Sequence, residues 1–466
     1  AATLRTLTGS AANANSAYAS GGVTNLGDVT VILTDTTLTV ATLNTLIGYS
    51  TGLVDATTVT TLTGSTTDVN TAFTAFAEGK INSLGNEAVT LTDTAVFAET
   101  VVAIDSATSG AINATNVMAL TGSASNANSA LTSAGLTNFD GDEAVTLTDT
   151  SLAAATLNTL DGNTTGAVDA ATVTTITGTA VAIVTVAQST SITTAANYAA
   201  TVDSDTANVA QALILDADTI GVVTATITER DLATLLALKD ANTNNALTII
   251  VTDPSADAAD LNSVATVTRI AIDATAVRTI TGTAAAIVIT AQSDGITTAT
   301  NYAATVDSGT ATVAQALILD AATTGAITAD IREGDLATLT TLTDANGNNA
   351  LTITVTDPSA DTVDLNTVAA ITSIPVDATS VTMITGSATT IITASQSDSI
   401  MTATNYAATV TDPDGVSVAA MALATLGAST TGTVTVSNAV EISGSVSETI
   451  AALVTDATKV VLTGNA

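Results

Sequence analysis

Short apolar segments alternate with polar turns along the chain. Ala88–Thr94 and Ala144–Thr150 both read AVTLTDT, in which Val or Leu alternates with Thr. Ala246–Asp253 (ALTIIVTD) and Ala350–Asp357 (ALTITVTD) repeat this alternation. A period of two places aliphatic side chains on one face of a strand and hydroxyls on the other, and Val and Thr favour strands. We therefore predict strands in these segments, with the Thr side chains facing outward.

A second pattern places aliphatic residues three positions apart. In Gly166–Gly178 (GAVDAATVTTITG), the apolar segment Val168–Ala170 is followed by Val173 and Ile176. This change of period predicts a strand followed by one or two helical turns. The pair recurs as Val59 and Leu62, Val117 and Leu120, Val277 and Ile280, and Val381 and Ile384. A related pair lies sixteen residues earlier, as Leu43 and Leu46, Val101 and Ile104, Leu157 and Leu160, Leu261 and Val264, and Leu365 and Val368.

Polar residues indicate where helices begin and where the chain turns. Asp precedes Leu in Asp231–Leu235 and Asp335–Leu339, and again at Asp260–Leu261 and Asp364–Leu365. Asp favours the first position of a helix because its carboxylate accepts backbone N–H bonds. Two Asn-rich clusters then interrupt the chain before the next strand, DANTNN at 240–245 and DANGNN at 344–349.

The sequence repeats itself. The tripeptide [L/I]TG ends a recurring phrase at Gly9, Gly64, Gly122, Gly178, Gly282, Gly386 and Gly464. Successive phrase ends lie 55, 58, 56, 104, 104 and 78 residues apart. Fixed periods are typical of stacked repeats, in which each unit buries its apolar face against its neighbours. Five or six strand candidates per 104-residue phrase predict roughly 17–21 residues per coil. We expect a repeat solenoid of right-handed β or β/α coils, leucine-rich-repeat-like or β-helix-like, with short strands and short helical turns.

Phrase length divides the chain into three zones. Residues 1–178 carry the short phrase, with a period of about 56. Residues 179–410 carry the 104-residue phrase with NYAATV at Asn197, Asn301 and Asn405, and residues 411–466 diverge. No Pro-rich or charge-rich linker separates the zones, so we predict one continuous stack.

The first and last segments have the same character as the interior. They read LRTLTGSA and VVLTGNA, and both lack the polar caps of an isolated solenoid. We expect flanking sequence or another copy of the chain to cover them.

The composition excludes several classes of function. The 466 residues carry a net charge of -35, with 8 Lys+Arg, 43 Asp+Glu, no His and no Cys. Without imidazole and thiol groups, the commonest general bases, nucleophiles and transition-metal ligands are missing, so we predict that the protein is not an enzyme. The shortage of basic residues argues against nucleic acid as a partner. No apolar run reaches about 18 residues, so no membrane span is predicted, and a hydrophobic fraction of 46% favours a folded chain.

Three loops carry the alternating oxygen ligands that calcium prefers. The candidate metal ligands are Asp240, Asn242 and Asn244, then Asp344, Asn346 and Asn348, and finally Asp412 and Asp414. The distal Glu of an EF-hand is absent, and turn formation explains the same residues equally well. Calcium is thus a candidate ligand, with no other cofactor predicted. The acidic turn Asp140–Glu143 has a similar character.

Other recurring residues have two interpretations each. Asp follows predicted strands at Asp35, Asp93 and Asp149 (LTDT) and at Asp55, Asp169, Asp273 and Asp377 ([V/I]DA). These carboxylates either bind calcium or cap the turn that follows. Outward Thr pairs form either an ice-binding face or a solvated surface, as at Thr90 and Thr92, Thr146 and Thr148, and Thr352 and Thr354. The three Tyr residues spaced by 104, Tyr198, Tyr302 and Tyr406, are either one repeated packing position or a contact for a glycan.

The phrases ATLNTLDGNTTGAVDAATVTTITG and AVTLTDT resemble the Ala/Thr/Asp-rich repeats of giant secreted surface proteins in marine cyanobacteria and other Gram-negative bacteria. The likeness covers most of residues 1–180 and, more loosely, the 104-residue phrases. Such proteins are associated with S-layers, adhesion or cell-surface motility. The resemblance implies an extracellular structural role, type I-like export and calcium dependence, with no catalytic residues. The glycine-rich nonapeptide calcium repeats that often accompany such proteins are absent from this sequence.

These observations predict an extracellular, cell-surface structural protein. It forms part of a surface layer or filament through stacking of repeats and end-to-end self-association. The alternative is an adhesin, or a glycan- or ice-binding module, that uses one face of the solenoid and has a cell-surface glycan as its partner.

Overall fold

The computed structural model describes residues 4–454 and 459–463, so the predicted phrase end at Gly464 lies outside the described residues. The chain forms two compact units. The first comprises residues 1–228 and 239–247, and the second comprises residues 229–238 and 248–466. Zones 1–178, 179–410 and 411–466 follow phrase length rather than compactness, and they stay a prediction.

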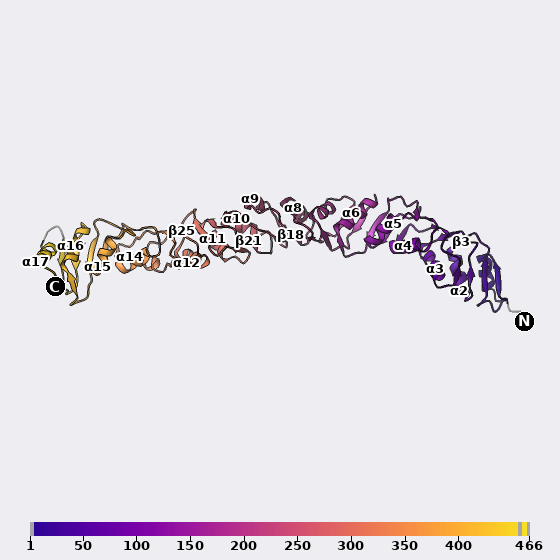
Figure 1. Ribbon diagram of the computed structural model, residues 1–466, viewed down its shortest axis with the longest axis horizontal. Coiled ribbons are helices and arrows are strands. Elements are labelled where there is room, and N and C mark those ends of the chain that lie inside the picture. The colour runs from indigo at the N-terminus through magenta and orange to yellow at the C-terminus, as the bar shows by residue number, and fades with distance from the viewer. Residues whose placement is uncertain (1–3, 455–458, 464–466) are drawn as a thin grey trace. The chain divides into compact units, whose positions relative to one another are not determined.

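In the first unit, short strands alternate with helices (Figure 1). The helices are α1 (Ala11–Ala19), α2 (Val40–Tyr49), α3 (Thr66–Ala77), α4 (Ala98–Ala107), α5 (Ala124–Leu131), α6 (Ala154–Asn163), α7 (Ala180–Ala187) and α8 (Val209–Asp218). The strands are β1 (Thr6–Gly9), β2 (Thr30–Leu33), β3 (Thr37–Thr39), β4 (Val54–Asp55), β5 (Thr61–Gly64), β6 (Ile81–Asn82), β7 (Ala88–Leu91), β8 (Ala95–Phe97), β9 (Ile112–Asn113), β10 (Ala119–Gly122), β11 (Leu136–Thr137), β12 (Ala144–Leu147), β13 (Ser151–Ala153), β14 (Val168–Ala170), β15 (Thr175–Gly178), β16 (Ile192–Thr194), β17 (Ala199–Val202), β18 (Val223–Thr226) and β19 (Ala246–Thr248).

The second unit is built in the same way. Its helices are α9 (Leu232–Leu235), α10 (Ala258–Ala265), α11 (Ala284–Gln292), α12 (Val313–Ala322), α13 (Leu336–Leu339), α14 (Thr362–Ala369), α15 (Ala388–Ser395), α16 (Ala420–Ser429) and α17 (Val446–Leu453). Its strands are β20 (Ser255–Asp257), β21 (Ile272–Ala274), β22 (Thr279–Gly282), β23 (Ile296–Thr298), β24 (Ala303–Val306), β25 (Ile327–Asp330), β26 (Ala350–Thr352), β27 (Ser359–Asp361), β28 (Val376–Ala378), β29 (Met383–Gly386), β30 (Ile400–Thr402), β31 (Ala407–Val410), β32 (Ser417–Ala419), β33 (Val434–Val436), β34 (Glu441–Ser443) and β35 (Val460–Leu462).

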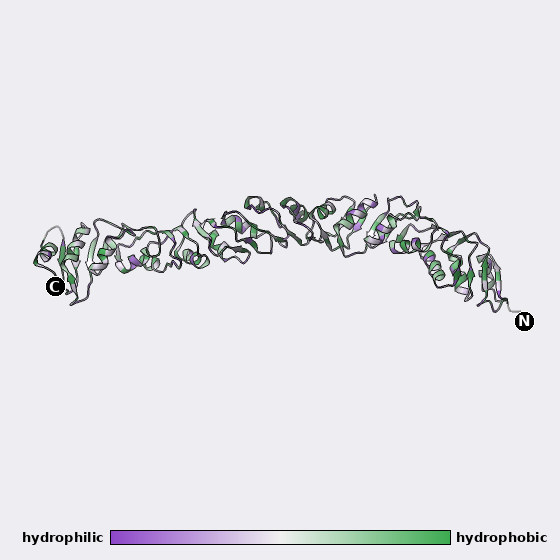
Figure 2. Ribbon diagram, in the orientation of Figure 1, coloured by the Kyte–Doolittle hydropathy of each residue, from purple (hydrophilic) through white to green (hydrophobic). Residues whose placement is uncertain are grey.

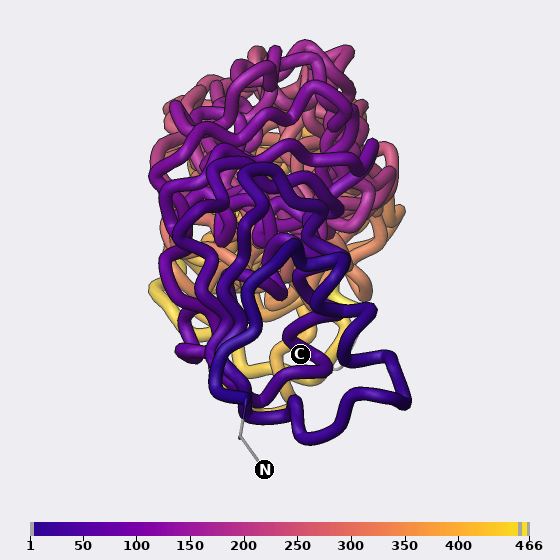
Figure 3. Tube along the Cα trace, turned by 90° about the vertical axis from the view of Figure 1, so that its right-hand side faces the viewer, coloured from indigo at the N-terminus to yellow at the C-terminus, as the bar shows by residue number. Residues whose placement is uncertain are grey.

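The strands pair in parallel with strands one turn of chain away. In the first unit the sheet orders are β1-β2-β4-β6, β11-β9-β7-β5-β3, β16-β14-β12-β10-β8 and β13-β15-β17-β18-β19. In the second unit they are β20-β22-β24-β25-β26, β27-β29-β31-β33-β35, β21-β23, β28-β30 and β32-β34. The register is regular, and it begins with Thr6 beside Thr30. In Figure 3 the earliest turns, drawn indigo, run beside one another in the order that this pairing sets.

One helix with the strands that precede it makes a repeat unit. In the first unit of the chain, the starts of α1, α3, α5 and α7 at Ala11, Thr66, Ala124 and Ala180 are separated by 55, 58 and 56, with one more helix between each pair. In the second, the starts of α10 and α14 at Ala258 and Thr362 are separated by 104, with three helices between them. The shorter phrase is therefore two repeat units and the longer phrase is four.

The predicted coil length of roughly 17–21 residues is wrong. Thr328 pairs with Ala350 and Thr61 pairs with Ala88, which are separations of 22 and 27 along the chain. The count failed because it gave each strand a coil of its own, whereas a repeat unit commonly holds two strands per helix. The coarser expectation is confirmed, since the fold is a repeated α/β arrangement of short parallel strands and helices, compatible with a solenoid.

The alternating segments form strands as predicted. β7, β12, β19 and β26 begin at Ala88, Ala144, Ala246 and Ala350, and in β7 the side chains of Val89 and Leu91 are buried. Hydrophobic segments recur in the strands and helices of both units (Figure 2). In the first unit, consecutive helices from α1 to α8 also pack against one another. Both faces of an interior repeat unit are thus covered by its neighbours.

The three-residue spacing has two structural origins. Leu43 and Leu46 lie buried in α2, which confirms the helical turns predicted for this earlier pair, sixteen residues before Val59 and Leu62. Val59 lies in a turn and Leu62 in β5, so the helical turns predicted for the later pairs are wrong. A buried Val in a turn followed by a buried strand residue gives the same spacing as a helix.

The [L/I]TG tripeptide ends a strand and prepares the next helix. Gly122, Gly178, Gly282 and Gly386 have φ between 127° and 157°, a region that favours glycine. The next residue caps the helix, because its hydroxyl accepts the backbone N–H three positions on. These caps are Ser10, Ser65, Ser123, Thr179, Thr283 and Ser387.

A recurring backbone contact joins successive repeat units at what we call the corner position. The carbonyl at this position accepts a Ser or Thr hydroxyl from the next repeat unit, over 2.5–3.5 Å. At Leu351 the Thr372 hydroxyl donates in this way at 2.7 Å, with Ile374 two residues after the donor. Further corner positions are Val29, Glu87, Glu143, Tyr198, Tyr302 and Tyr406, all buried. Two residues after the donor to each of these six a glycine passes the same carbonyl, at Gly52, Gly110, Gly166, Gly221, Gly325 and Gly432. A Cβ on Gly325 would lie 2.1 Å from the Tyr302 oxygen.

We expect Gly325→Ala to destabilise the protein because the added Cβ has to displace backbone. The cost should be about 1–3 kcal/mol, as for other overpacked sites. Gly162→Ala is the matched control, since Gly162 lies in α6 with nothing within 4 Å of a built Cβ. Ala there should raise the free energy of unfolding by up to about 1 kcal/mol. Urea unfolding followed by circular dichroism measures both, and equal midpoints for the two variants would contradict the contact.

Candidate cation-binding loops

The first predicted calcium loop is held together by its own Asp. The Asp240 carboxylate accepts backbone N–H bonds from Asn244 (3.2 Å) and Asn245 (3.1 Å). Asn242 and Asn244 donate their side-chain amides to the carbonyls of Thr219 (3.4 Å) and Ile220 (2.9 Å), one repeat unit earlier. The Asn244 Oδ1 atom is buried without a hydrogen-bond partner.

The second loop repeats this arrangement one long phrase later. The Asp344 carboxylate accepts from the N–H groups of Gly347, Asn348 and Asn349 over 2.8–3.2 Å. Asn346 and Asn348 donate to the carbonyls of Thr323 (3.5 Å) and Thr324 (3.1 Å). In both loops the predicted ligand side chains bind backbone, and calcium binding there stays a prediction.

The third predicted site does not form one cluster of contacts. Asp412 Oδ2 accepts the N–H of Ala388, the first residue of α15, at 2.8 Å. Asp414 Oδ1 accepts the N–H of Ala439 at 2.8 Å. One carboxylate therefore reaches back along the chain and the other reaches forward.

A buried carboxylate lies beneath each Asn-rich loop, and no motif pointed to it. Asp216 is 7% exposed and accepts from the Asn245 side-chain amide at 2.8 Å, and Asp320 is 8% exposed and accepts from Asn349 at 3.2 Å. Asn245 and Asn349 are each 1% exposed. The available signal was the exact recurrence of VAQALILDA, which requires the same environment for Asp216 and Asp320. These groups fix the loops to α8 and α12, in each case the second helix before the loop.

The Asp residues of LTDT cap helices, but in the preceding repeat unit. Asp35, Asp93 and Asp149 accept the N–H of Ala11, Thr66 and Ala124, which lie 24 to 27 residues earlier. The expectation that they cap the turn after them is therefore wrong. The same contact is made by Asp205 to α7, Asp253 to α9, Glu333 to α12, Asp357 to α13 and Asp412 to α15. A carboxylate at a helix N-terminus satisfies a free N–H and interacts favourably with the helix dipole.

The Asp residues of [V/I]DA do cap the following turn. Asp55, Asp169, Asp273 and Asp377 accept the N–H two residues on, over 2.9–3.1 Å. In the last two, the Thr hydroxyl and N–H of that residue lower the pKa of the carboxyl. Asn113 fills the same place and accepts from Thr115 in the same way.

The acidic turn Asp140–Glu143 brings three carboxylates together. Oxygen atoms of Asp140, Asp142 and Glu143 all lie within 4.8 Å of one another. The hydrogen bond and charge of Asp140 raise the pKa of Asp142. Burial raises the pKa of Glu143, a rise that nearby backbone N–H groups oppose and the charges of both Asp residues reinforce.

The candidate recognition faces differ from their predicted form. Tyr198, Tyr302 and Tyr406 are at most 1% exposed, which confirms a repeated packing position and leaves none of these three rings open to a glycan. Along one sheet the outward row reads Phe97, Thr121, Thr146, Asp169 and Thr193, so a regular Thr array does not occur along this row.

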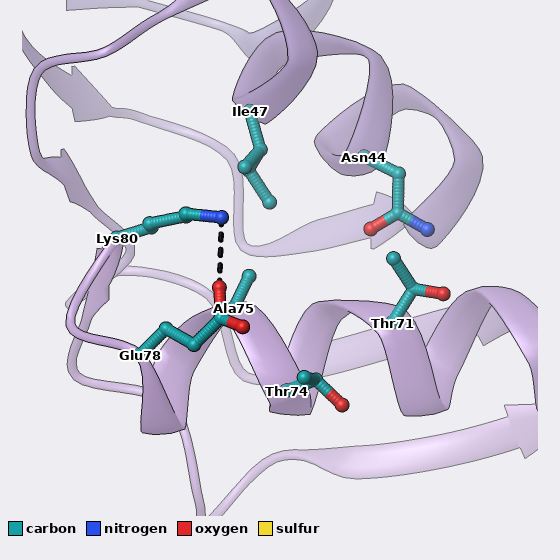
Figure 4. Close-up of a pocket in the computed structure, with 7 residues that line it drawn as sticks. All are labelled: Asn44, Ile47, Thr71, Thr74, Ala75, Glu78 and Lys80. Carbon is teal, nitrogen blue, oxygen red and sulfur yellow. Dashed lines mark ion pairs between the residues drawn. The ribbon is translucent and has the colours of Figure 1, made fainter.

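A surface pocket of about 230 Å³ lies between α2 and α3 (Figure 4). It is lined by Asn44, Ile47, Thr71, Thr74, Ala75, Glu78 and Lys80. Glu78 and Lys80 form an ion pair of 2.7 Å, and the hydroxyls of Thr71 and Thr74 donate to carbonyls of α3. Both hydroxyls of this lining are therefore bound to the backbone of α3.

No helix in residues 4–454 and 459–463 has the length and apolar character to cross a membrane. No protein-family model matches the sequence, and no curated protein matches it. Proposals about function therefore depend on the contacts described above and on the pattern of the repeats.

We expect Asp149→Ala to weaken the packing of α5 against the next repeat unit. The variant loses a helix-capping contact, which typically costs about 0.5–2 kcal/mol. Asp294→Ala removes the same charge from an exposed turn and serves as control. In chemical unfolding, the free energy of unfolding of the Asp149 variant should be clearly lower than that of the control. Equal stability would mean that the carboxylate at Ala124 contributes nothing.

The lowered pKa of Asp377 predicts a pH-dependent contribution to stability. A folded-state pKa below the ordinary value of 3.8 stabilises the fold above that pH, and the benefit is lost as the pH falls through the folded pKa. Asp377→Asn copies the natural Asn113 and retains an acceptor. The stability difference between wild type and variant should therefore be steady from pH 7 to 5 and shrink toward pH 2–3. Urea unfolding across this range tests it, and a difference that grows in acid would contradict it.

Proposed function

We propose that the chain is a right-handed β/α solenoid that serves as an extracellular structural segment of a surface layer or filament. The observation that carries this proposal is the repetition of one set of contacts between successive repeat units: strand pairs, corner hydroxyls and helix-capping carboxylates. Each contact joins residues roughly one repeat unit apart. The right hand follows because parallel strands joined through a helix cross over right-handedly in nearly all proteins.

The mechanism is mechanical. Pulling two repeat units apart has to break several strand hydrogen bonds, a corner hydroxyl bond and a carboxylate bond together. Such a stack is stabilised mainly by contacts between nearest neighbours. The chain carries its chemistry in hydroxyls, amides and carboxylates, and most of those described above bind backbone. A structural role without catalysis fits this use of polar groups.

Assembly follows from the same contacts. Because one kind of contact joins many pairs of repeat units within a chain, a second copy offers surfaces of the same kind. End-to-end association of copies is a heterologous contact, which produces filaments when it does not close into a ring. The net charge of -35 keeps individual copies soluble and makes their association sensitive to cations. The extracellular location is supported by the resemblance of the repeats to those of secreted surface proteins.

Electron microscopy and sedimentation of the purified chain, with and without a chelator, test this proposal. We expect fibres or a lattice that grow with protein concentration. The structural proposal is wrong if the protein stays monomeric at all concentrations and instead binds glycans on an array or shapes growing ice crystals. That outcome favours an adhesin or ice-binding module that uses one face of the solenoid.

A further inference from the structure

Glu143 occupies a corner position whose counterpart, Glu87, has one carboxylate oxygen bound by loop N–H groups. At the equivalent Glu87, which is also fully buried, Oε2 accepts backbone N–H bonds from Gly85 (2.7 Å) and Asn86 (3.2 Å), and only Oε1 has no hydrogen-bond partner. In the first phrase the same position is the apolar Val29. A buried Glu is tolerated at the corner when loop N–H groups bind it, and otherwise an apolar residue fits.

The Glu143 carboxylate has no such hydrogen bonds from loop N–H groups. Its side chain is 0% exposed, and neither Oε1 nor Oε2 has a hydrogen-bond partner. Backbone N–H groups of the turn lie close enough to lower its pKa, yet none of them has the geometry of a hydrogen bond to it. The carboxylate is therefore held inside the corner with its oxygens open to a further partner.

The loop before Glu143 is one residue longer than the loop before Glu87. Asn138 and Ser83 share a positive φ, of 57° and 64°, and stand five and four residues before their Glu. The extra residue is Asp140, and Asp142 replaces the Asn86 of the shorter loop. The longer loop therefore adds two acids beside the buried carboxylate.

Oxygens of all three side chains lie within 4.8 Å of one another. No Lys or Arg forms an ion pair with them in the part of the chain that the structure describes. A buried charge without a partner is strongly unfavourable, and two further negative charges make it more so. A cation among the three would offset both effects.

We propose that Asp140, Asp142 and Glu143 bind a divalent cation of the calcium type. Hard cations prefer carboxylate oxygens, and calcium accepts the incomplete, flexible set that a surface turn offers, with water and carbonyl oxygens completing its coordination. Asp140 and Asp142 are exposed, so an ion from solvent meets these two carboxylates first.

The ion would act on the contact between two repeat units. The Glu143 carbonyl accepts the Thr164 hydroxyl at 2.7 Å, and the Gly141 carbonyl accepts the Thr165 N–H at 2.6 Å. Both donors come from the next repeat unit. A cation that fixes this loop fixes the surface on which that unit packs, which adds a ligand-dependent joint to the structural role proposed above.

Equilibrium dialysis of the metal-free chain against calcium, in physiological salt, tests the site. Asp140→Asn with Asp142→Asn keeps the shape of both side chains and should lower the calcium bound at saturation by one ion per chain. Asp294→Asn with Asp398→Asn removes the same charge from exposed turns and should bind as much as wild type. Equal binding by wild type and the Asp140/Asp142 variant overturns the proposal, and so does a similar loss in the control, which would mean counterion accumulation only.

Thermal unfolding of Glu143→Gln gives a second readout. In chelator the variant should be at least as stable as wild type, because it removes an unpartnered buried charge. Added calcium should raise the melting temperature of wild type and close or reverse that gap. Glu87→Gln is the matched control, since Glu87 already has N–H partners, and its response to calcium should equal that of wild type. The same calcium response in Glu143→Gln as in wild type contradicts the site. Neither readout depends on whether the chains form filaments.

Discussion

The structure depends on polar groups of one repeat unit completing the backbone of the next. Each helix begins with N–H groups that have no partner inside the helix, and each tight turn leaves carbonyls unpaired. Here a carboxylate about one repeat unit further on accepts the first helical N–H, and a hydroxyl fills the carbonyl at the corner position. A single repeat unit therefore lacks the partners that its own backbone needs, which makes the unit stable only beside another.

This dependence explains the composition. Thr forms strands, and its hydroxyl also donates to the carbonyl at the corner position of the preceding repeat unit. Asp accepts the N–H group at the start of a helix. The acidity of the chain is then largely a structural requirement. The carboxylates need no Lys or Arg partners, because backbone N–H groups bind most of those described above. Mutual repulsion among the exposed carboxylates opposes this stabilisation. Salt at about 0.1 M screens that repulsion beyond a distance of about 10 Å.

Local patterns were predictable from the sequence, whereas contacts between repeat units were not. Alternation identified β7 and β12, and Asp before Leu identified α9 and α13, because these signals lie within a few residues. Asp35 looked like a cap for the turn after it, since its true partner, Ala11, is distant in sequence and depends on strand register. The unit length was missed for a related reason: a count of strands does not reveal how many share one helix.

The corner position shows how such a fold can acquire chemistry. What each repeat unit requires there is a carbonyl, which any residue provides, so the side chain differs among Val29, Glu87, Glu143 and Tyr198. The Tyr198 hydroxyl binds Asp218 at 2.7 Å and Glu87 Oε2 accepts two N–H groups, whereas Glu87 Oε1 and the hydroxyl of Tyr302, at another corner position, have no hydrogen-bond partner. Glu143 alone among these four has both polar oxygens unpartnered, and it alone follows two acids in a lengthened loop. A bound cation would explain both the unpartnered carboxylate of Glu143 and the two acids in the longer loop before it. Without a cation, each of these two features requires its own explanation.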